Sequence, residues 1–316
     1  MRFLISRLSS LGDVVCTLPA AVALRNRYPE CEIVWAVSPA FADVVNACSA
    51  VNTVVHVKPR LHPSTWPRIE GEFDAAFDLQ GLFKSAIVVR QAKARRKLGY
   101  HWQREGAAFF SAAVTPDPTS LHVVDQYVDV VRAYNAEMER AEFGLAPTAE
   151  ATEGVRALLR EADVEGNYVL LNPGAGWASK RWPPSAFAEL VKGLQGTGVT
   201  PILIGGGDEA AISAAAAVEH FSQAIGSKLP VSLLGKTSIS QLVALIAGAR
   251  AHVGGDTGST HIAAALGVPA VGLYSITRPE RCCPYGQIER THYDRDGLDR
   301  IHPKAVLNTL LQAIGR

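Results

Sequence analysis

The chain has 316 residues, of which 48% are hydrophobic and 19% charged, and its formal net charge is +1. This composition is that of a folded protein with room for about two domains, and it excludes a disordered chain and a broadly basic nucleic-acid-binding protein. No apolar run approaches the ~20 residues that cross a bilayer, and the N-terminal segment MRFLISRLSS becomes polar too early for a secretory signal. We therefore expect a cytoplasmic protein that binds no nucleic acid.

Short runs rich in β-branched residues alternate with helical patterns along the whole chain. In the first half the expected strands lie at residues 2–6, 31–37, 52–57 and 73–79, and a long helical pattern covers residues 121–139. In the second half the expected strands lie at residues 167–172, 200–205, 231–235, 251–255 and 269–274, and a last helix begins after Pro303. This alternation predicts an α/β fold with parallel sheets that carry helices on both faces.

A break rich in Gly and Pro, FGLAPTAEA, follows the long helical pattern, and the series of strands restarts after it. We therefore expect two doubly wound domains that meet within residues 141–152. The predicted domains are 1–148 and 149–300, and residues 301–316 form a closing helix. In two-domain α/β proteins ligands bind at the carboxyl ends of the strands, in the cleft between the domains.

The segment ISRLSSLGDVV (5–15) places Asp13 between the first strand and the first helix. A carboxylate at this point can cap the helix, because a helix N-terminus favours negative charge. It can equally be a catalytic base that points into a cleft. Residues 56–104 contain ten Lys and Arg but four acidic residues, which indicates either a solvated face or a site for an anionic partner.

The segment AHVGGDTGSTHIAAALGVPAVGLY (251–274) is the strongest local signal for a ligand. Its strand ends in two glycines, and Asp256, Thr257 and Gly258 then open a helix, with His261 one turn along. The first N–H groups of a helix and the positive end of its dipole form a site for phosphate. The simpler interpretation is a capped helix with His261 on a wet face, but capping alone does not require so many glycines.

Two further strand ends lead into glycine-rich loops. The first, in LLNPGAGWASKRWPPSAFAELV (170–191), projects Lys180, which can neutralise charge on a departing phosphate. The second, in ILIGGGDEAA (202–211), places Asp208 and Glu209 at a helix start, where they can accept hydrogen bonds from ribose. A surface lysine and ordinary first-turn acids are the alternatives. A Walker A loop is absent, and the missing dinucleotide fingerprint argues against an NAD-linked oxidoreductase.

These features together predict group transfer from a nucleotide-activated donor onto a nucleophile that Asp13 deprotonates. The Asp-x-Asp pattern of Asp294 and Asp296 follows no clear strand, so we interpret it as a solvated loop and expect transfer without a metal. The five cysteines form no C-x-x-C pair and are expected to be reduced, and the adjacent Cys282 and Cys283 receive no role. A nucleotide-sugar-binding module without catalysis is the alternative from another functional class.

Five segments follow one another in order along almost the whole chain: SSLGDVVCTLPA, DLQGLFKSA, LGYHWQREG, NPGAGWASKRWP and GGDTGSTHIAAALGVPAVGLY. They closely resemble the heptosyltransferase family, glycosyltransferase family 9, and the early segments look most like its heptosyltransferase I branch. The resemblance implies a GT-B architecture, in which two Rossmann-like domains face each other across a cleft and a terminal helix returns to the first domain. It also implies inverting transfer of heptose from ADP-heptose, a substrate and not a cofactor, to a Kdo sugar of the lipopolysaccharide inner core.

The resemblance also implies roles for residues at matching positions. Asp13 becomes the general base, Lys180 a contact of the donor phosphates and Glu209 a contact of the ribose. The donor loop is formed by Asp256, Thr257, Gly258 and His261. The acceptor side is formed by Gln80, Gly81 and Lys84, and the partners expected for the negative charge of the acceptor are Arg7, Arg60 and Lys84.

Other acceptors within the family, a heptosylated core or a protein hydroxyl, remain open at this stage. The segment HWQREGAAFFSAAV (101–114) is expected to be a packed helix, and the alternatives are a flap over a lipid acceptor or a shallow contact with the inner membrane.

Overall fold

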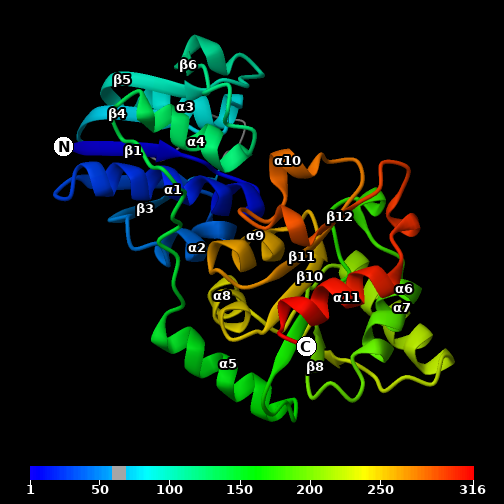
Figure 1. Cartoon of the computed structure of the whole chain (residues 1–316). Coiled ribbons are helices and arrows are strands. Elements are labelled where there is room, and N and C mark those ends of the chain that lie inside the picture. The colour runs from blue at the N-terminus through cyan, green and yellow to red at the C-terminus, as the bar shows by residue number, and fades with distance from the viewer. Residues whose placement is uncertain (59–68) are drawn as a thin grey trace. The chain divides into compact units, whose positions relative to one another are not determined.

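A computed structural model describes residues 1–58 and 69–316. The chain divides into two compact units, Met1–Ala146 and Pro147–Arg316, whose colours run from blue to green and from green to red in Figure 1. The division falls inside the Gly- and Pro-containing stretch in which the sequence places a domain boundary. Arg60, which is expected on the acceptor side, lies outside the described residues.

The first unit is built on a parallel sheet of six strands in the order β3-β2-β1-β4-β5-β6. The strands are β1 (Arg2–Ser6), β2 (Glu32–Val37), β3 (Thr53–His56), β4 (Glu72–Asp78), β5 (Lys93–Tyr100) and β6 (Ala112–Val114). The central strand β1 pairs with a strand on each side, so that Leu4 is opposite Val34 of β2 and Ala76 of β4. All three side chains are buried, as expected for a central parallel strand covered on both faces.

The helices of this unit are α1 (Leu11–Arg27), α2 (Ala42–Asn46), α3 (Phe83–Gln91) and α4 (Val123–Arg132). The chain moves from β1 to β2 in one direction along the sheet and from β4 to β5 in the other. Because parallel crossovers are right-handed, α1 and α3 must cover opposite faces of the sheet. The order therefore reverses between β1 and β4, and the loops that follow these two strands meet at that point.

The second unit repeats this topology in the order β12-β11-β10-β7-β8-β9, again with parallel pairing. Its strands are β7 (Tyr168–Asn172), β8 (Thr200–Leu203), β9 (Val231–Ser232), β10 (Ala251–Gly255), β11 (Ala270–Tyr274) and β12 (Thr291–Tyr293). Here the order reverses between β7 and β10, so the loops after these strands form the corresponding crevice. Both units thus have the strand order of a Rossmann-like fold.

Six principal helices cover the second sheet. They are α5 (Ala149–Glu161), α6 (Pro184–Gly193), α7 (Glu209–Ala224), α8 (Ile239–Ala247), α9 (Gly258–Ala265) and α11 (Pro303–Ala313), and a single turn forms α10 (Pro279–Cys282). On one face α6 packs against α7 and α11, and on the other α8 packs against α5 and α9.

The closing helix α11 was expected to return to the first domain, but its apolar residues pack in the second unit. Its apolar residues Val306 and Leu310 are fully buried, and with Ile314 they belong to the core of the second unit. This core also contains Phe187 and Leu190 of α6. The helix is therefore assigned to the second unit, because its apolar stripe is buried against α6 and the adjacent sheet.

All nine strands expected from the sequence are present in the structure. The structure also contains β5, β6 and β12, which the sequence analysis did not predict. The strand β5 has the sequence KARRKLGY, and its charged half is largely exposed while Leu98, Gly99 and Tyr100 are buried. A strand that is only half covered lacks the continuous apolar run by which the other strands are recognised.

The segment 101–114 is not the packed helix that the sequence favours. It contains a single 3₁₀ turn (Ala107–Phe109) and the edge strand β6. Glu105 and Gly106 adopt positive φ angles of 55° and 79°, which interrupt a right-handed helix. Within the described ranges 1–58 and 69–316, no helix combines the length and apolar character needed to cross a membrane.

Candidate active site

The crevice of the first unit lies where β1 and β4 end. Asp13 occupies the third position of α1, and its Oδ2 accepts hydrogen bonds from the backbone N–H of Ser10 at 3.2 Å and from its hydroxyl at 2.8 Å. Asp13 is therefore the N3 residue of a capping box whose N-cap is Ser10, and it is not itself the N-cap. The side chain of Asp13 nevertheless remains 45% exposed, so the same carboxylate is accessible to a ligand.

Arg7 is the cation that faces this carboxylate, with 2.8 Å between its Nη2 and Oδ1 of Asp13. Its side chain is only 6% exposed, its Nη1 donates to the carbonyl of Leu79, and its guanidinium lies over the ring of Tyr127. Burial opposes the charged form, but the charges of Tyr127 and Asp13 outweigh it and raise the pKa of Arg7. The structure pairs Arg7 with Asp13 and Leu79, and its expected contact with an acceptor stays a prediction.

Two residues expected on the acceptor side, Gln80 and Lys84, converge on the loop that precedes Asp13. The Oε1 of Gln80 accepts from the N–H of Leu8 at 2.9 Å, and its Nε2 donates to Oγ of Ser9 at 3.3 Å. The ammonium of Lys84 donates to the same Ser9 hydroxyl at 3.1 Å. The structure thus brings four predicted residues together around the segment 7–10.

Asp78, which the sequence analysis did not select, holds the backbone of the loop that follows β4. It is fully buried at the end of β4 and accepts hydrogen bonds from the N–H groups of Gln80 at 3.1 Å and Gly81 at 2.9 Å. Burial raises the pKa of Asp78, although these N–H groups oppose the shift. Gly81 has φ +70°, and a Cβ there would lie 2.6 Å from the carbonyl oxygen of Trp102. The position therefore requires glycine.

The crevice of the second unit is centred on Asp256, which follows β10. Its Oδ2 accepts from Nζ of Lys180 at 2.6 Å and from the hydroxyl of Thr277 at 3.3 Å, and its Oδ1 lies 3.2 Å from Nε2 of His261. Burial by itself raises the pKa of Asp256, but the hydrogen bonds and charges of His261 and Lys180 outweigh it and lower the pKa. The structure thus joins three of the predicted donor residues in one charge-balanced cluster.

Thr257 is the N-cap residue of α9, and Gly258 is its first residue. The cap makes no side-chain hydrogen bond to the helix backbone. Beneath it lie two buried residues that the sequence analysis missed, Asn172 at the end of β7 and His252 within β10. Polar side chains inside apolar strands were the available signal, because a buried polar group needs partners.

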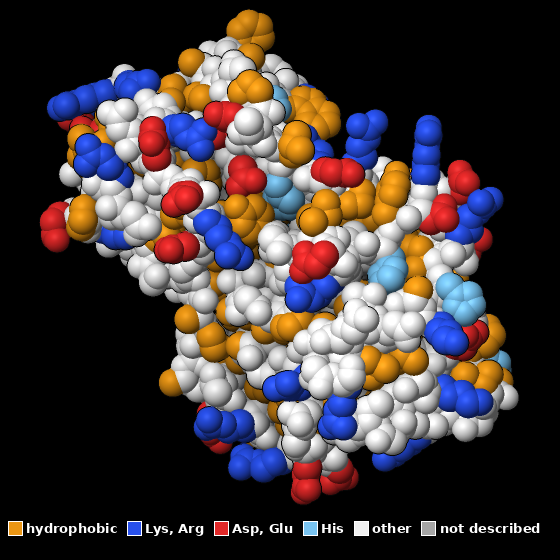
Figure 2. Space-filling model, viewed as in Figure 1, with side chains coloured by type: hydrophobic (Ala, Val, Ile, Leu, Met, Phe, Trp, Pro, Cys, Tyr) orange, Lys and Arg blue, Asp and Glu red, His pale blue; other side chains and the backbone are white. Residues whose placement is uncertain are grey.

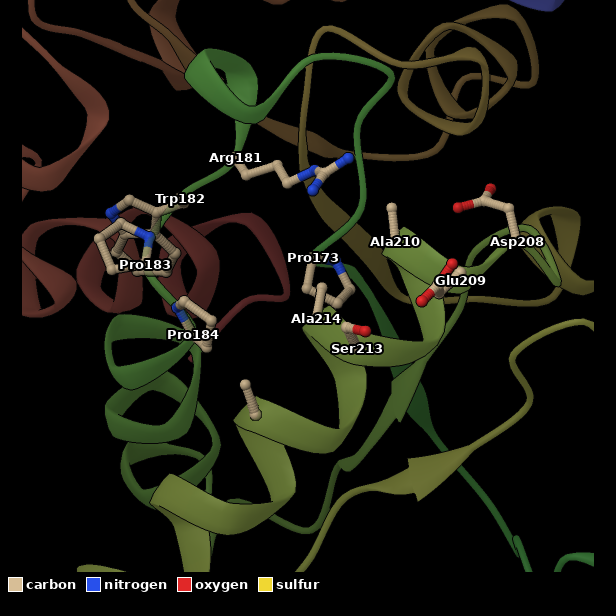
Figure 3. Close-up of a pocket in the computed structure, with 11 residues that line it drawn as sticks. Pro173, Arg181, Trp182, Pro183, Pro184, Asp208, Glu209, Ala210, Ser213 and Ala214 are labelled. Atoms are coloured by element: carbon tan, nitrogen blue, oxygen red, sulfur yellow. The ribbon is translucent and has the colours of Figure 1, made fainter.

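Glu209 is the first residue of α7 and follows Asp208, whose side chain caps that helix by accepting from the N–H of Ala211 at 3.0 Å. Both acids line a cavity of about 700 Å³, shown in Figure 3, with Arg181 and a proline pair across from them. Figure 3 places Arg181 on the loop that leads into α6 and Glu209 at the start of α7. Of the predicted donor residues, Asp208 and Glu209 line this cavity, whereas Lys180, Asp256 and His261 do not, so the cavity and the Asp256 cluster are separate features of the same sheet edge.

The remaining candidates from the sequence have local explanations. Asp294 accepts from the N–H of Asp296 at 2.9 Å, and Asp296 forms an exposed ion pair with Arg300. Nowhere in the described ranges do three or more His, Cys, Asp or Glu residues form a group that could hold a metal ion. Cys283 is buried and Cys282 is half-buried.

Residues 65–293 match the model of a family described as glycosyltransferase family 9 (heptosyltransferase). The chain is 29% identical to lipopolysaccharide heptosyltransferase 1 of Pseudomonas aeruginosa over 305 residues, which cover 91% of this chain and 82% of the relative.

Among solved structures, a family 9 glycosyl transferase from Veillonella parvula matches with a TM-score of 0.83 at 17% identity, covering 99% of this chain and 97% of that one. The E. coli heptosyltransferase WaaC with ADP-2-deoxy-2-fluoro heptose matches with a TM-score of 0.74 at 25% identity and covers 99% of both chains. The GT-B heptosyltransferase fold expected from the sequence is thereby confirmed.

Proposed function

Because the chain belongs to glycosyltransferase family 9, and is therefore a glycosyltransferase, we propose that it transfers heptose from ADP-heptose to a Kdo sugar of the lipopolysaccharide inner core. The observation that carries this proposal is the pairing of chemistries at equivalent places in the two units. One crevice holds an accessible carboxylate, and the other holds the charge-balanced cluster of Asp256, Lys180 and His261 beside a helix N-terminus. Solved relatives contain ADP or an ADP-heptose analogue, which supports ADP-heptose as the donor.

The donor diphosphate is assigned to the N-terminus of α9. The first N–H groups of a helix and its dipole attract anions, and Gly258 allows close approach to the backbone. An ammonium has three donors, so the bond from Lys180 to Asp256 leaves others for a phosphate oxygen. Hydrogen-bond donors that are fixed before the reaction stabilise the departing diphosphate more than they stabilise the intact ADP-heptose, and this difference accelerates transfer. Glu209 is the proposed contact for the ribose.

Asp13 is the proposed general base. In an inverting displacement the acceptor hydroxyl attacks the anomeric carbon on the face opposite the leaving diphosphate, and its proton passes to the base. Arg7 and Ser10 fix the orientation of the Asp13 carboxylate, while its exposed fraction allows a hydroxyl to approach. Arg7 acts through Asp13.

The acceptor is assigned to the first unit, around Gln80, Gly81 and Lys84. A phosphorylated Kdo–lipid A acceptor is anionic, which suits the basic excess of residues 56–104. Phe109 is 89% exposed and Trp102 is 54% exposed. Figure 2 shows hydrophobic side chains protruding at the top of the view, over the region that Figure 1 labels β6. We assign this segment a shallow contact with the membrane that carries the acceptor.

The decisive experiment is incubation of the whole protein with ADP-heptose and either Kdo₂-lipid A or an already heptosylated core, followed by mass spectrometry. One added heptose on Kdo₂-lipid A, α-linked by NMR, is the expected product. Transfer only to the heptosylated core, or only to a protein hydroxyl, would move the enzyme to another acceptor. Donor binding without transfer to any acceptor would show a binding module instead of an enzyme.

A further inference from the structure

We infer that the Thr257 hydroxyl does not contact the donor and belongs to a closed hydrogen-bond circuit, in which Asn172 and His252 are positioning residues. The circuit leaves the first N–H groups of α9 to the diphosphate. This inference rests on the proposed function, because it specifies how the donor loop meets its ligand. It follows from assigning each hydroxyl proton in turn.

The amide of Asn172 fixes one end of the circuit. Its Oδ1 lies 3.0 Å from the backbone nitrogen of Gly174, which can only donate, so this atom is the amide oxygen. Its Nδ2 therefore donates to Oγ of Ser259 at 2.8 Å and to Oγ1 of Thr257 at 3.3 Å. One buried side chain thus ties the loop after β7 to the loop after β10.

The carbonyl of Gly255 fixes the other end. It accepts from the hydroxyl of Thr260 at 2.7 Å, so the Thr260 proton is committed. In the contact of 3.1 Å between the Thr257 and Thr260 hydroxyls, Thr257 must therefore be the donor. The Thr257 proton is then used as well, and the contact of 3.1 Å between Ser259 and Thr257 requires Ser259 to donate.

His252 completes the assignment. Ser259 has given its proton to Thr257, so in the contact of 2.9 Å the Nε2–H of His252 donates to Ser259. The Nδ1 of His252 is buried without a hydrogen-bond partner, and an acceptor tolerates this better than an N–H group does. Burial, with a smaller contribution from the charge of His261, lowers the pKa of His252 to about 3, which keeps the ring neutral as this assignment requires.

The Thr257 hydroxyl is saturated in this arrangement, because it accepts from Asn172 and Ser259 and donates to Thr260. A threonine at an N-cap ordinarily accepts from an N–H group of the first turn. Here the Thr257 side chain does not cap α9, because the circuit holds its hydroxyl in another direction. The N–H groups that a cap would satisfy are thereby kept for an anion.

The test is a double-mutant cycle on ADP affinity, measured by titration calorimetry on the whole protein. Thr257→Val keeps the shape but removes the hydroxyl, and Asn172→Leu removes the amide. We expect each variant to bind ADP about tenfold more weakly, and the double variant to bind no more weakly than either single one. Thr257→Ser keeps the circuit and should bind within about twofold of the wild-type protein.

Variants of His252 form the second part of the experiment, because His252 is fully buried and cannot touch a ligand. His252→Leu should weaken ADP binding about threefold, and His252→Gln, whose amide can still donate to Ser259, should restore it. Ser222→Ala, a change at another fully buried hydroxyl in α7, is the matched control and should leave ADP affinity unchanged.

Two results would overturn the inference. One is a loss of ADP affinity of about 100-fold in the double variant, because two independent contacts would multiply the effects of Thr257→Val and Asn172→Leu. The other is unchanged affinity in both Asn172→Leu and His252→Leu. A wild-type protein that binds no ADP would instead contradict the proposed function, and the circuit would then be decided by the same cycle in unfolding free energy, where additivity would overturn it.

Discussion

The two units have the same strand order, and each carries an aspartate in the crevice where that order reverses, yet the two aspartates differ in surroundings. Asp13 is 45% exposed and pairs with Arg7, which is itself buried. Asp256 is 18% exposed and meets Lys180, His261 and Thr277. The topology therefore places an aspartate in the crevice of each unit, and the neighbouring side chains determine what chemistry that aspartate can do.

We propose that the difference separates a reactive carboxylate from a structural one. Both oxygens of Asp256 are engaged, and its cations hold its pKa low, so it stays ionised and suits fixing Lys180 beside a phosphate site. Asp13 is held by its neighbours in one orientation but keeps an accessible surface. We propose proton transfer at Asp13 and charge balance at Asp256.

The largest expected effect is on turnover in Asp13→Asn. The amide keeps the size of the side chain but cannot take a proton, so kcat should fall by about 10²–10⁴-fold. The dissociation constant of ADP, measured by calorimetry, should stay within about twofold, because Asp13 is in the unit without the donor loop. Full turnover in this variant would remove Asp13 from the chemistry.

Lys180→Met tests the second aspartate. It removes the cation that balances Asp256 and the hydrogen-bond donor that we propose for the departing diphosphate, so kcat/KM should fall by about 10²–10³-fold. The double variant Lys180→Met with Asp256→Asn should recover part of the ADP affinity, since the uncompensated carboxylate is then gone as well. If the double variant binds ADP more weakly than Lys180→Met, Asp256 contacts the donor in its own right.

The pH dependence of stability sharpens the contrast inside the second unit. The native state keeps His252 neutral because its pKa is lowered to about 3, whereas the unfolded chain takes up a proton below a pH of about 6.5. Stability from this group is therefore present above that pH and is lost as the pH falls toward the folded pKa. At pH 4.5 the loss should be about 3 kcal/mol.

Urea unfolding at pH 7 and pH 4.5 measures this loss, and His252→Gln should remove most of it. At pH 4.5 an unfolded aspartate, whose ordinary pKa is about 3.9, is still mostly ionised, so the lowered pKa of Asp256 contributes little to the difference. Equal losses in wild-type protein and variant would show that His252 does not titrate as its burial implies.

The smallest expected effect concerns Gly81→Ala in the first crevice. The new Cβ would meet the backbone of Trp102 at a positive φ, so the free energy of unfolding should fall by about 2–3 kcal/mol. Gly226→Ala is the control, because φ there is +67° and nothing lies within 4 Å of a Cβ. The control should lose about 1 kcal/mol, the cost of the positive φ alone. Equal losses would mean that the 101–104 loop moves away.

Much of this molecule could be predicted from local sequence. Strands that are buried on both faces are largely apolar, and the glycine-rich ends of β7, β8 and β10 were visible as breaks in those runs. Prediction failed where a strand is half covered, as in β5, and where two positive φ angles interrupt a helix-like pattern, as in residues 101–114.

The sequence by itself determined the α/β alternation, the number of units and the residue types at the strand ends, because these depend on periodicity and on the conformational freedom of glycine. Only the tertiary structure decided that Gln80 and Lys84 reach Ser9, and that Asn172 and His252 lie beneath Thr257. The physical reason is that these partners lie on different strands and loops, and a hydrogen bond between them depends on how the sheet aligns its strands. That alignment is a property of the folded chain and not of any one segment.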